Sequence, residues 1–195
     1  MNSKVLVTIL KMMLLGVVTG PLMGCAYRMG APERRIPGDY HTVFVPMFQN
    51  LTTEPGIEVF FTNALIQELE RSRVAQVTPH EMAEVEIQGQ IETMNHLSGG
   101  QRTSSEYPLL PEGSVLATGY RILINCNVNV VRITDKKVLW SGKINGERTY
   151  SSAQVGTGGI NSVNPLYNLS AKRTNIESMA AQMMVEAHDR ITENF

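Results

Sequence analysis

The chain has 195 residues, and 43% of them are hydrophobic. Its 17 basic and 18 acidic side chains give a formal net charge of −1 at pH 7. A nucleic-acid-binding domain carries a basic excess, so this composition excludes a general nucleic-acid partner. A chain of this length accommodates one domain and a short additional segment.

The first 25 residues have the organisation of an export signal. Lys4 and Lys11 supply a basic start, Met12–Val18 form an apolar core, and the segment ends in Leu22-Met23-Gly24-Cys25. A transmembrane helix needs about 20 apolar residues, and a glycine and a proline end this run too early. The pattern resembles a bacterial lipoprotein signal, which implies cleavage of residues 1–24 and lipid attachment to the sulfur and new amino group of Cys25. An ordinary secretory signal with an incidental cysteine is the alternative.

Cleavage would leave 195 − 24 = 171 residues, with 15 basic and 18 acidic side chains and a net charge of −3. Cys126 is then the only free thiol, so no intramolecular disulfide is possible, and we expect this side chain to be buried. Residues 25–40 are rich in Gly, Pro and Arg without an apolar period, which predicts a lipidated tether that reaches at most about 50 Å. Residues 41–195 are expected to form a single domain.

The domain is predicted to begin with a strand over residues 41–48, in which Pro46 marks an edge or a bulge. A helix is predicted over residues 56–70, with Thr52 or Thr53 as its N-cap. Its apolar stripe comprises Ile57, Phe60, Phe61, Ala64, Ile66 and Leu69. A short strand follows at residues 74–78.

Two longer segments alternate between apolar and polar side chains. Apolar residues or glycine occupy every second position from Val85 to Ile91. A second apolar set runs from Ile122 to Val130 and includes Cys126. Glu, Gln and Asn dominate the positions between these residues in both segments. This period of two predicts strands of an antiparallel sheet with one face exposed to water. Residues 134–137 predict a turn into a strand over residues 138–150. One face of that strand is expected to carry Val138, Trp140 and Ile144.

The last predicted element is a helix that begins between Ser170 and Thr174, the latter in capping-box spacing with Glu177. Its apolar stripe is expected to pack in the core, with a Met-rich binding groove as the alternative. The stripe comprises Ile176, Met179, Ala180, Met183, Met184, Ala187 and Ile191. Residues 97–114 and 151–169 show no period and are expected to form long loops.

This order of elements predicts an α+β fold. Two amphipathic helices on one face of a four- to five-stranded sheet, mainly antiparallel or mixed, form a two-layer sandwich.

The chain lacks the motifs of the common catalytic sites. Its four histidines show no metal-ligand spacing, and it has neither a nucleophile elbow nor a phosphate-binding loop. We therefore expect no enzyme, no cofactor and no metal centre. Arg102, Lys136 and Lys137 stand at the ends of predicted loops and are candidate contacts for the phosphates of a lipid head group, with plain solvation as the alternative.

Several segments together resemble one family. The start Cys25-Ala26-Tyr27-Arg28 resembles the Cys-Gly-Tyr start of LptE, the lipopolysaccharide-assembly lipoprotein family, with Ala26 in place of the usual glycine. Residues 43–50 and 53–56 resemble the first strand and helix entry of that family, and residues 61–65 resemble its first helix.

The resemblance implies a two-layer α/β fold and a non-catalytic lipoprotein in the outer membrane of a Gram-negative bacterium. LptE-like proteins sit as a plug inside the LptD β-barrel, support its assembly and bind lipopolysaccharide on its way to the outer leaflet. The absence of Asp after Cys25 implies the outer membrane, with the domain on the periplasmic side. No motif transfers the family's lipopolysaccharide contacts, so Arg102, Lys136 and Lys137 remain expectations from charge alone.

A different interaction class is the alternative. The first strand and helix also resemble the small domains of CsgG-like secretion-pore subunits and LpoB-like activators of cell-wall synthesis. A CsgG-like pore needs two amphipathic membrane hairpins, and residues 97–114 and 151–169 alternate too poorly for that role. An LpoB-like activator usually has a longer tether than residues 26–40.

Overall fold

The computed structural model describes residues 34–103, 105, 112–113, 115–151, 154–157, 160–163 and 165–193. The predicted signal and Cys25 lie outside these residues. A folded unit begins at Arg34. Within the part of the chain that is described, no helix combines the length and the apolarity that crossing a membrane requires.

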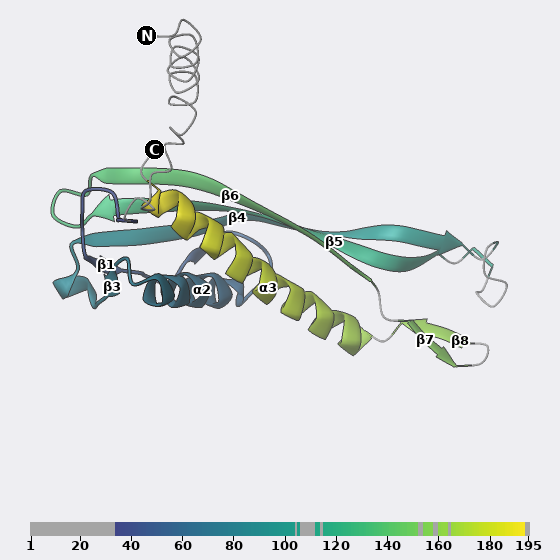
Figure 1. The fold of residues 1–195 in the computed structure, drawn as a ribbon. Coiled ribbons are helices and arrows are strands. Elements are labelled where there is room, and N and C mark those ends of the chain that lie inside the picture. Colours follow the sequence, from purple (N-terminus) through teal and green to yellow (C-terminus); the bar gives the residue numbers. More distant parts are fainter. Residues whose placement is uncertain are drawn as a thin grey trace, which may run out of the picture. The chain divides into compact units, whose positions relative to one another are not determined.

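A six-stranded mixed sheet forms one layer of the fold (Figure 1). Three long strands pair antiparallel in the order β4, β5, β6: β4 (Val85–Thr103), β5 (Val115–Arg132) and β6 (Val138–Ser151). Three short strands add parallel pairs: β1 (Thr42–Phe44) and β2 (Gln49–Asn50) both pair with β4, and β3 (Gln76–Val77) pairs with β1. A separate hairpin consists of β7 (Gln154–Thr157) and β8 (Ile160–Val163).

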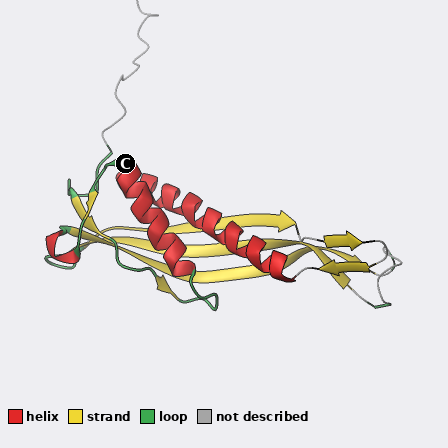
Figure 2. Cartoon of the chain, turned by 90° about the horizontal axis from the view of Figure 1, so that it is seen from below, coloured by secondary structure: helices red, strands yellow, loops and turns green. Residues whose placement is uncertain are grey.

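Two helices form the second layer. Helix α2 (Ile57–Ser72) and helix α3 (Pro165–Thr192) lie on the same face of the sheet (Figure 2), and a single 3₁₀ turn, η2 (His80–Met82), precedes β4. The predicted α+β two-layer sandwich is thus confirmed. The sheet has six strands instead of four to five because the predicted strand over residues 41–48 ends at Phe44, as β1, and a further short strand, β2, follows at Gln49–Asn50.

The core lies between the helices and the sheet. All seven residues of the predicted α3 stripe are buried, so core packing is confirmed for this Met-rich face. Cys126 is 1% exposed, as predicted. In α2 the pattern missed Leu65, which is fully buried, whereas Phe60, Ala64 and Ile66 are only partly buried. The prediction for Val138 was wrong: it is 55% exposed because a register shift opposite Val130 and Val131 places it outside the regular alternation.

Both predicted loops proved to contain regular structure. Strand β4 continues through Thr103 and β5 begins at Val115, so residues 97–103 of the first segment pair with residues 115–121. The second segment contains β7, β8 and the first turns of α3. Helix α3 begins at Pro165, earlier than predicted, because proline is favoured in the first turn of a helix, where its missing N–H costs nothing.

The two predicted N-caps were also wrong. Gly56 caps α2 in the left-handed conformation, at φ 84°, without a side-chain hydrogen bond. Thr52 instead donates through its hydroxyl to Asn50 Oδ1 at 2.8 Å, within the loop before the helix. Thr174 and Glu177 lie inside α3.

Residues 34–40, which the sequence assigned to the tether, pack with the domain. Ile36 is 1% exposed and belongs to the core cluster. The Arg34 guanidinium lies 2.7 Å from the Asp189 carboxylate on α3, and the Arg132 guanidinium stacks over the Tyr40 ring at 5.7 Å. The folded unit therefore starts closer to Cys25 than residue 41.

Candidate functional site: the open face of the sheet

The sheet face that points away from α2 and α3, here named the open face, is rich in amides. Its side chains alternate along β4, β5 and β6 with the buried residues of the core. Strand pairing aligns them in rows across the sheet, such as Gln88, Asn129 and Ser141, or Gln90, Asn127 and Lys143. The amides of this face are Gln49, Gln88, Gln90, Asn125, Asn127, Asn129 and Asn145.

Charged side chains on the open face occur largely in opposite pairs. Lys143 Nζ lies 3.1 Å from a carboxylate oxygen of Glu92, and Arg121 lies 3.2 Å from Glu147. Both pairs are largely exposed, so they contribute little to stability. They do neutralise one another locally, which leaves hydrogen-bonding amides as the main chemistry of this face.

A pocket interrupts the open face beside β4. Phe44 pairs with Glu86 and Gln49 pairs with Gln90, so four residues, 45–48, lie opposite only three, 87–89. Pro46 within this stretch has no N–H to donate to a neighbouring strand. The extra residue makes the segment arch away from β4 and opens the pocket, so of the two alternatives predicted at Pro46, an edge or a bulge, the structure shows a bulge.

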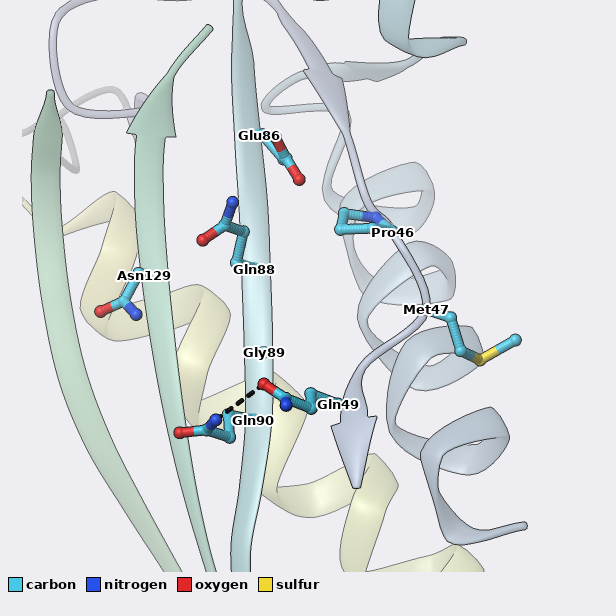
Figure 3. A pocket seen from close by; sticks show the side chains of 8 residues that line it. All are labelled: Pro46, Met47, Gln49, Glu86, Gln88, Gly89, Gln90 and Asn129. Carbon is cyan, nitrogen blue, oxygen red and sulfur yellow. Dashed lines mark hydrogen bonds between the residues drawn. The ribbon is translucent and has the colours of Figure 1, made fainter. Parts of the chain in front are cut away.

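The pocket has a volume of about 370 Å³ (Figure 3). Gln90 donates through Nε2 to Gln49 Oε1 at 2.8 Å. The Gln88 and Asn129 amides, on adjacent strands, and the Glu86 carboxylate form no hydrogen bond within the described part of the chain. The lining comprises Pro46, Met47, Gln49, Glu86, Gln88, Gly89, Gln90 and Asn129.

The rim of the pocket is held from the core side. Phe48 is 2% exposed, and its ring covers Gly89, where an added Cβ would come within 2.1 Å of the ring. The Phe48 backbone N–H donates to Thr62 Oγ1 of α2 at 3.0 Å. Because Phe48 is fixed in this way, the preceding residues Pro46 and Met47 are held in place at the surface.

The structure does not bring the three predicted cationic contacts together. Lys136 and Lys137 follow β5 at the end of the sheet where Arg132 pairs with Val85. Arg102, whose side chain lies outside the described part, pairs with Leu116 near the other end. These ends are 102 − 85 = 17 residue steps apart on β4, or about 55 Å at 3.3 Å per residue.

A polar aromatic cluster, which the sequence analysis missed, lies on the helix-facing side of the sheet. It consists of His96 of β4, Tyr120 of β5 and Tyr150 of β6, with His96 Nε2 2.8 Å from the Tyr150 hydroxyl. Burial, followed by the charge of Lys172, lowers the pKa of His96, and burial raises the pKa of Tyr150. Only the strand register aligns these rings, so no local motif could have identified them.

A search of the described residues finds no group of three or more His, Cys, Asp or Glu side chains placed to hold a metal ion. Burial raises the pKa of the Cys126 thiol to about 12, which leaves it protonated and unreactive at neutral pH.

The chain is similar to known proteins in sequence and in fold. Residues 40–194 match the sequence model of the LptE family, described as lipopolysaccharide-assembly. No curated protein sequence matches the chain.

Two solved structures share the fold. A protein from Xanthomonas campestris has a TM-score of 0.51 at 12% identity, over 83% of this chain and 88% of its own. A neuraminyllactose-binding hemagglutinin homolog from Helicobacter pylori has a TM-score of 0.50 at 12% identity, over 84% of this chain and 92% of its own. At such identities the likeness concerns the fold alone.

Proposed function

The chain belongs to the LptE family of lipopolysaccharide-assembly proteins, and on that premise we propose that it is the partner of an LptD-like β-barrel in the outer membrane. In this proposal the protein is anchored by lipids on Cys25, faces the periplasm and catalyses no reaction. It forms a plug in the barrel, supports its assembly and helps to deliver lipopolysaccharide to the outer leaflet.

The open face is the structural observation that supports a plug. Interiors of large β-barrels are polar and filled with water. A face made mainly of amides and neutralised ion pairs can lie against such a wall at little cost in desolvated charge, and the Glu86 carboxylate, unpaired within the described residues, lies in the pocket of this face. An apolar face would be expected instead if the sheet packed against lipid or a hydrophobic partner.

The separated cations fit a ligand that is long compared with a single head group. In this proposal Lys136 and Lys137 at one end of the sheet and Arg102 near the other act as two independent contacts for lipopolysaccharide phosphates. Lys136 takes a left-handed conformation, at φ 57°, and the Lys137 backbone N–H donates to Asp135 Oδ1 at 3.2 Å. This turn therefore presents the two lysines from a defined loop.

Affinity purification of the full-length lipidated chain from membranes tests the proposal. We expect a large β-barrel to co-purify at a ratio of 1:1. Recovery of a cell-wall synthase or of a homo-oligomeric ring, with no barrel, would contradict it and favour the LpoB-like or CsgG-like alternative. The match to the LptE family over residues 40–194 is the reason to expect the barrel.

A further inference from the structure

We propose that the pocket beside Pro46 binds a neutral saccharide unit, a hexopyranose ring that carries hydroxyl groups and no phosphate. The inference deepens the proposed function and rests on it for the source of the ligand, because lipopolysaccharide contains such rings. The choice of ligand class comes from the size, the hydrogen-bonding groups and the charge of the pocket.

The pocket supplies hydrogen-bonding groups that match the hydroxyls of a sugar. Gln88 and Asn129 are directly paired across β4 and β5, and their amides have no partner in the described part of the chain. Each amide offers two N–H donors and one carbonyl acceptor, and the Glu86 carboxylate accepts. Neighbouring hydroxyls of a sugar ring both donate and accept, so they match this mixed set. The volume of about 370 Å³ falls in the usual range for small-ligand sites, about 300–1,000 Å³.

The charge of the pocket lining disfavours an anionic ligand. No lysine or arginine lines the pocket, and Glu86 is the only charged side chain there. A phosphate or carboxylate ligand would meet this carboxylate without a compensating cation. A divalent metal ion would have only one of its two charges balanced by this single carboxylate. An uncharged hydroxylated ligand avoids both problems.

The rim of the pocket offers an apolar surface to one face of a sugar ring. The Pro46 ring lies on the side of the pocket opposite β4 and gives it one apolar edge beside its polar floor, whereas the Met47 side chain points toward α2, where Thr62 Oγ1 donates to Met47 Sδ at 3.4 Å (Figure 3). A pyranose ring has C–H groups on its faces and hydroxyls around its edge. The C–H groups of the Pro46 ring suit contact with such a C–H face.

Ligand-observed saturation-transfer NMR on the full-length chain in detergent tests this inference. Maltotriose is the neutral probe and glucose 6-phosphate is the anionic one. We expect saturation transfer to maltotriose, with a weaker signal for glucose 6-phosphate. No transfer to maltotriose, or a stronger signal for the phosphate, would overturn the inference.

Three variants locate the binding. In Gln88→Leu/Asn129→Leu the transfer should fall at least fivefold, whereas Asn145→Leu, an exposed position on β6 of the same face outside the pocket, should retain it. Met47→Leu, which changes a side chain that points toward α2 and away from the pocket amides, is a second control and should also retain the transfer. Equal transfer from the wild type and the double variant would overturn the inference.

Barrel recovery with the same variants separates this inference from the proposed function. Maltotriose binding without a co-purifying barrel contradicts the proposed function and leaves the saccharide site standing. Barrel recovery without maltotriose binding contradicts the saccharide site and supports the proposed function. If the double variant loses the barrel but retains maltotriose transfer, the pocket is a protein contact and the inference is overturned.

Discussion

Gly89 is the residue on which the shape of the pocket depends. It lies at a core-facing position of β4, and the Phe48 ring occupies the space that a side chain would need. The close approach lets the chain from Val45 to Phe48 bulge outward at Pro46 while Phe48 remains buried. One missing Cβ in the core thus determines the form of the opposite surface.

Gly89→Ala should destabilise the domain by about 1–3 kcal/mol, because the added methyl overpacks the core against Phe48. Gly99→Ala is the matched control in the same strand, since its nearest neighbouring atom, the Gly119 carbonyl oxygen, lies 4.0 Å away. The control should change stability by no more than about 0.5 kcal/mol. Urea unfolding followed by circular dichroism measures both, and equal midpoints for the two variants would contradict this account.

Among the elements, β4 and β5 show what sequence patterns can and cannot predict. The alternation from Ile122 to Val130 is strong, and it predicted the strand and its buried face correctly. In β4, by contrast, the strand beyond Leu97 runs through Ser98, Gly99 and Gly100, which carry no apolar period. Pairing with β5 determines its structure there, and such pairing is non-local information.

The candidate site was predictable in part for the same reason. Pro46 indicated an edge or a bulge, of which the structure has the bulge, and the polar positions of β4 and β5 correctly indicated a face exposed to water. The pocket itself depends on four residues lying opposite three between Glu86 and Gln90, which only the register defines. The aromatic cluster also requires the register of three strands.

The pKa of His96 makes the aromatic cluster sensitive to acid. Burial lowers the pKa of this imidazole below its ordinary value of 6.5, so the unfolded chain binds its proton more readily than the folded one. The stabilisation from neutral His96 is complete above pH 6.5 and is lost as the pH falls through the folded-state pKa. NMR titration of the His96 ring should give a pKa below 6.5.

A variant assigns this effect to His96. Stability should fall less steeply between pH 7 and pH 5 in His96→Gln than in the wild type, because the substitution removes the contribution of His96. Urea unfolding at several pH values measures the slopes. A His96 pKa at or above 6.5, or identical slopes, would show that burial does not govern this group.

At the scale of the whole molecule, the functional candidates are distributed along the length of the sheet. Lys136 and Lys137 lie at one end, the amide pocket follows along β4, and Arg102 lies near the far end. A single small ligand cannot reach both cationic positions. An extended amphiphile with several phosphates and sugars could contact them in succession.

Charge reversal should therefore act separately at the two ends. Lys136→Glu/Lys137→Glu and Arg102→Glu should each weaken lipopolysaccharide binding by a few fold, and the combined variant should show the product of both effects, because distant sites are additive. Binding of the full-length chain to lipopolysaccharide in detergent measures this, with Lys143→Glu on the open face as a control. Unchanged binding in all variants would show that these residues do not contact lipopolysaccharide. It would not bear on the proposed role as a plug.

The central claim is that the open face of this LptE-family chain lies against the inside of a β-barrel. Photo-crosslinking in living cells, from a photoreactive amino acid at Asn127 of the open face, tests it most directly, with Gln182, an exposed position of α3, for comparison. The account predicts an adduct between Asn127 and a large outer-membrane β-barrel. A barrel adduct from Gln182 but none from Asn127, or an Asn127 adduct only with a cell-wall synthase or a second copy of the chain, would contradict it.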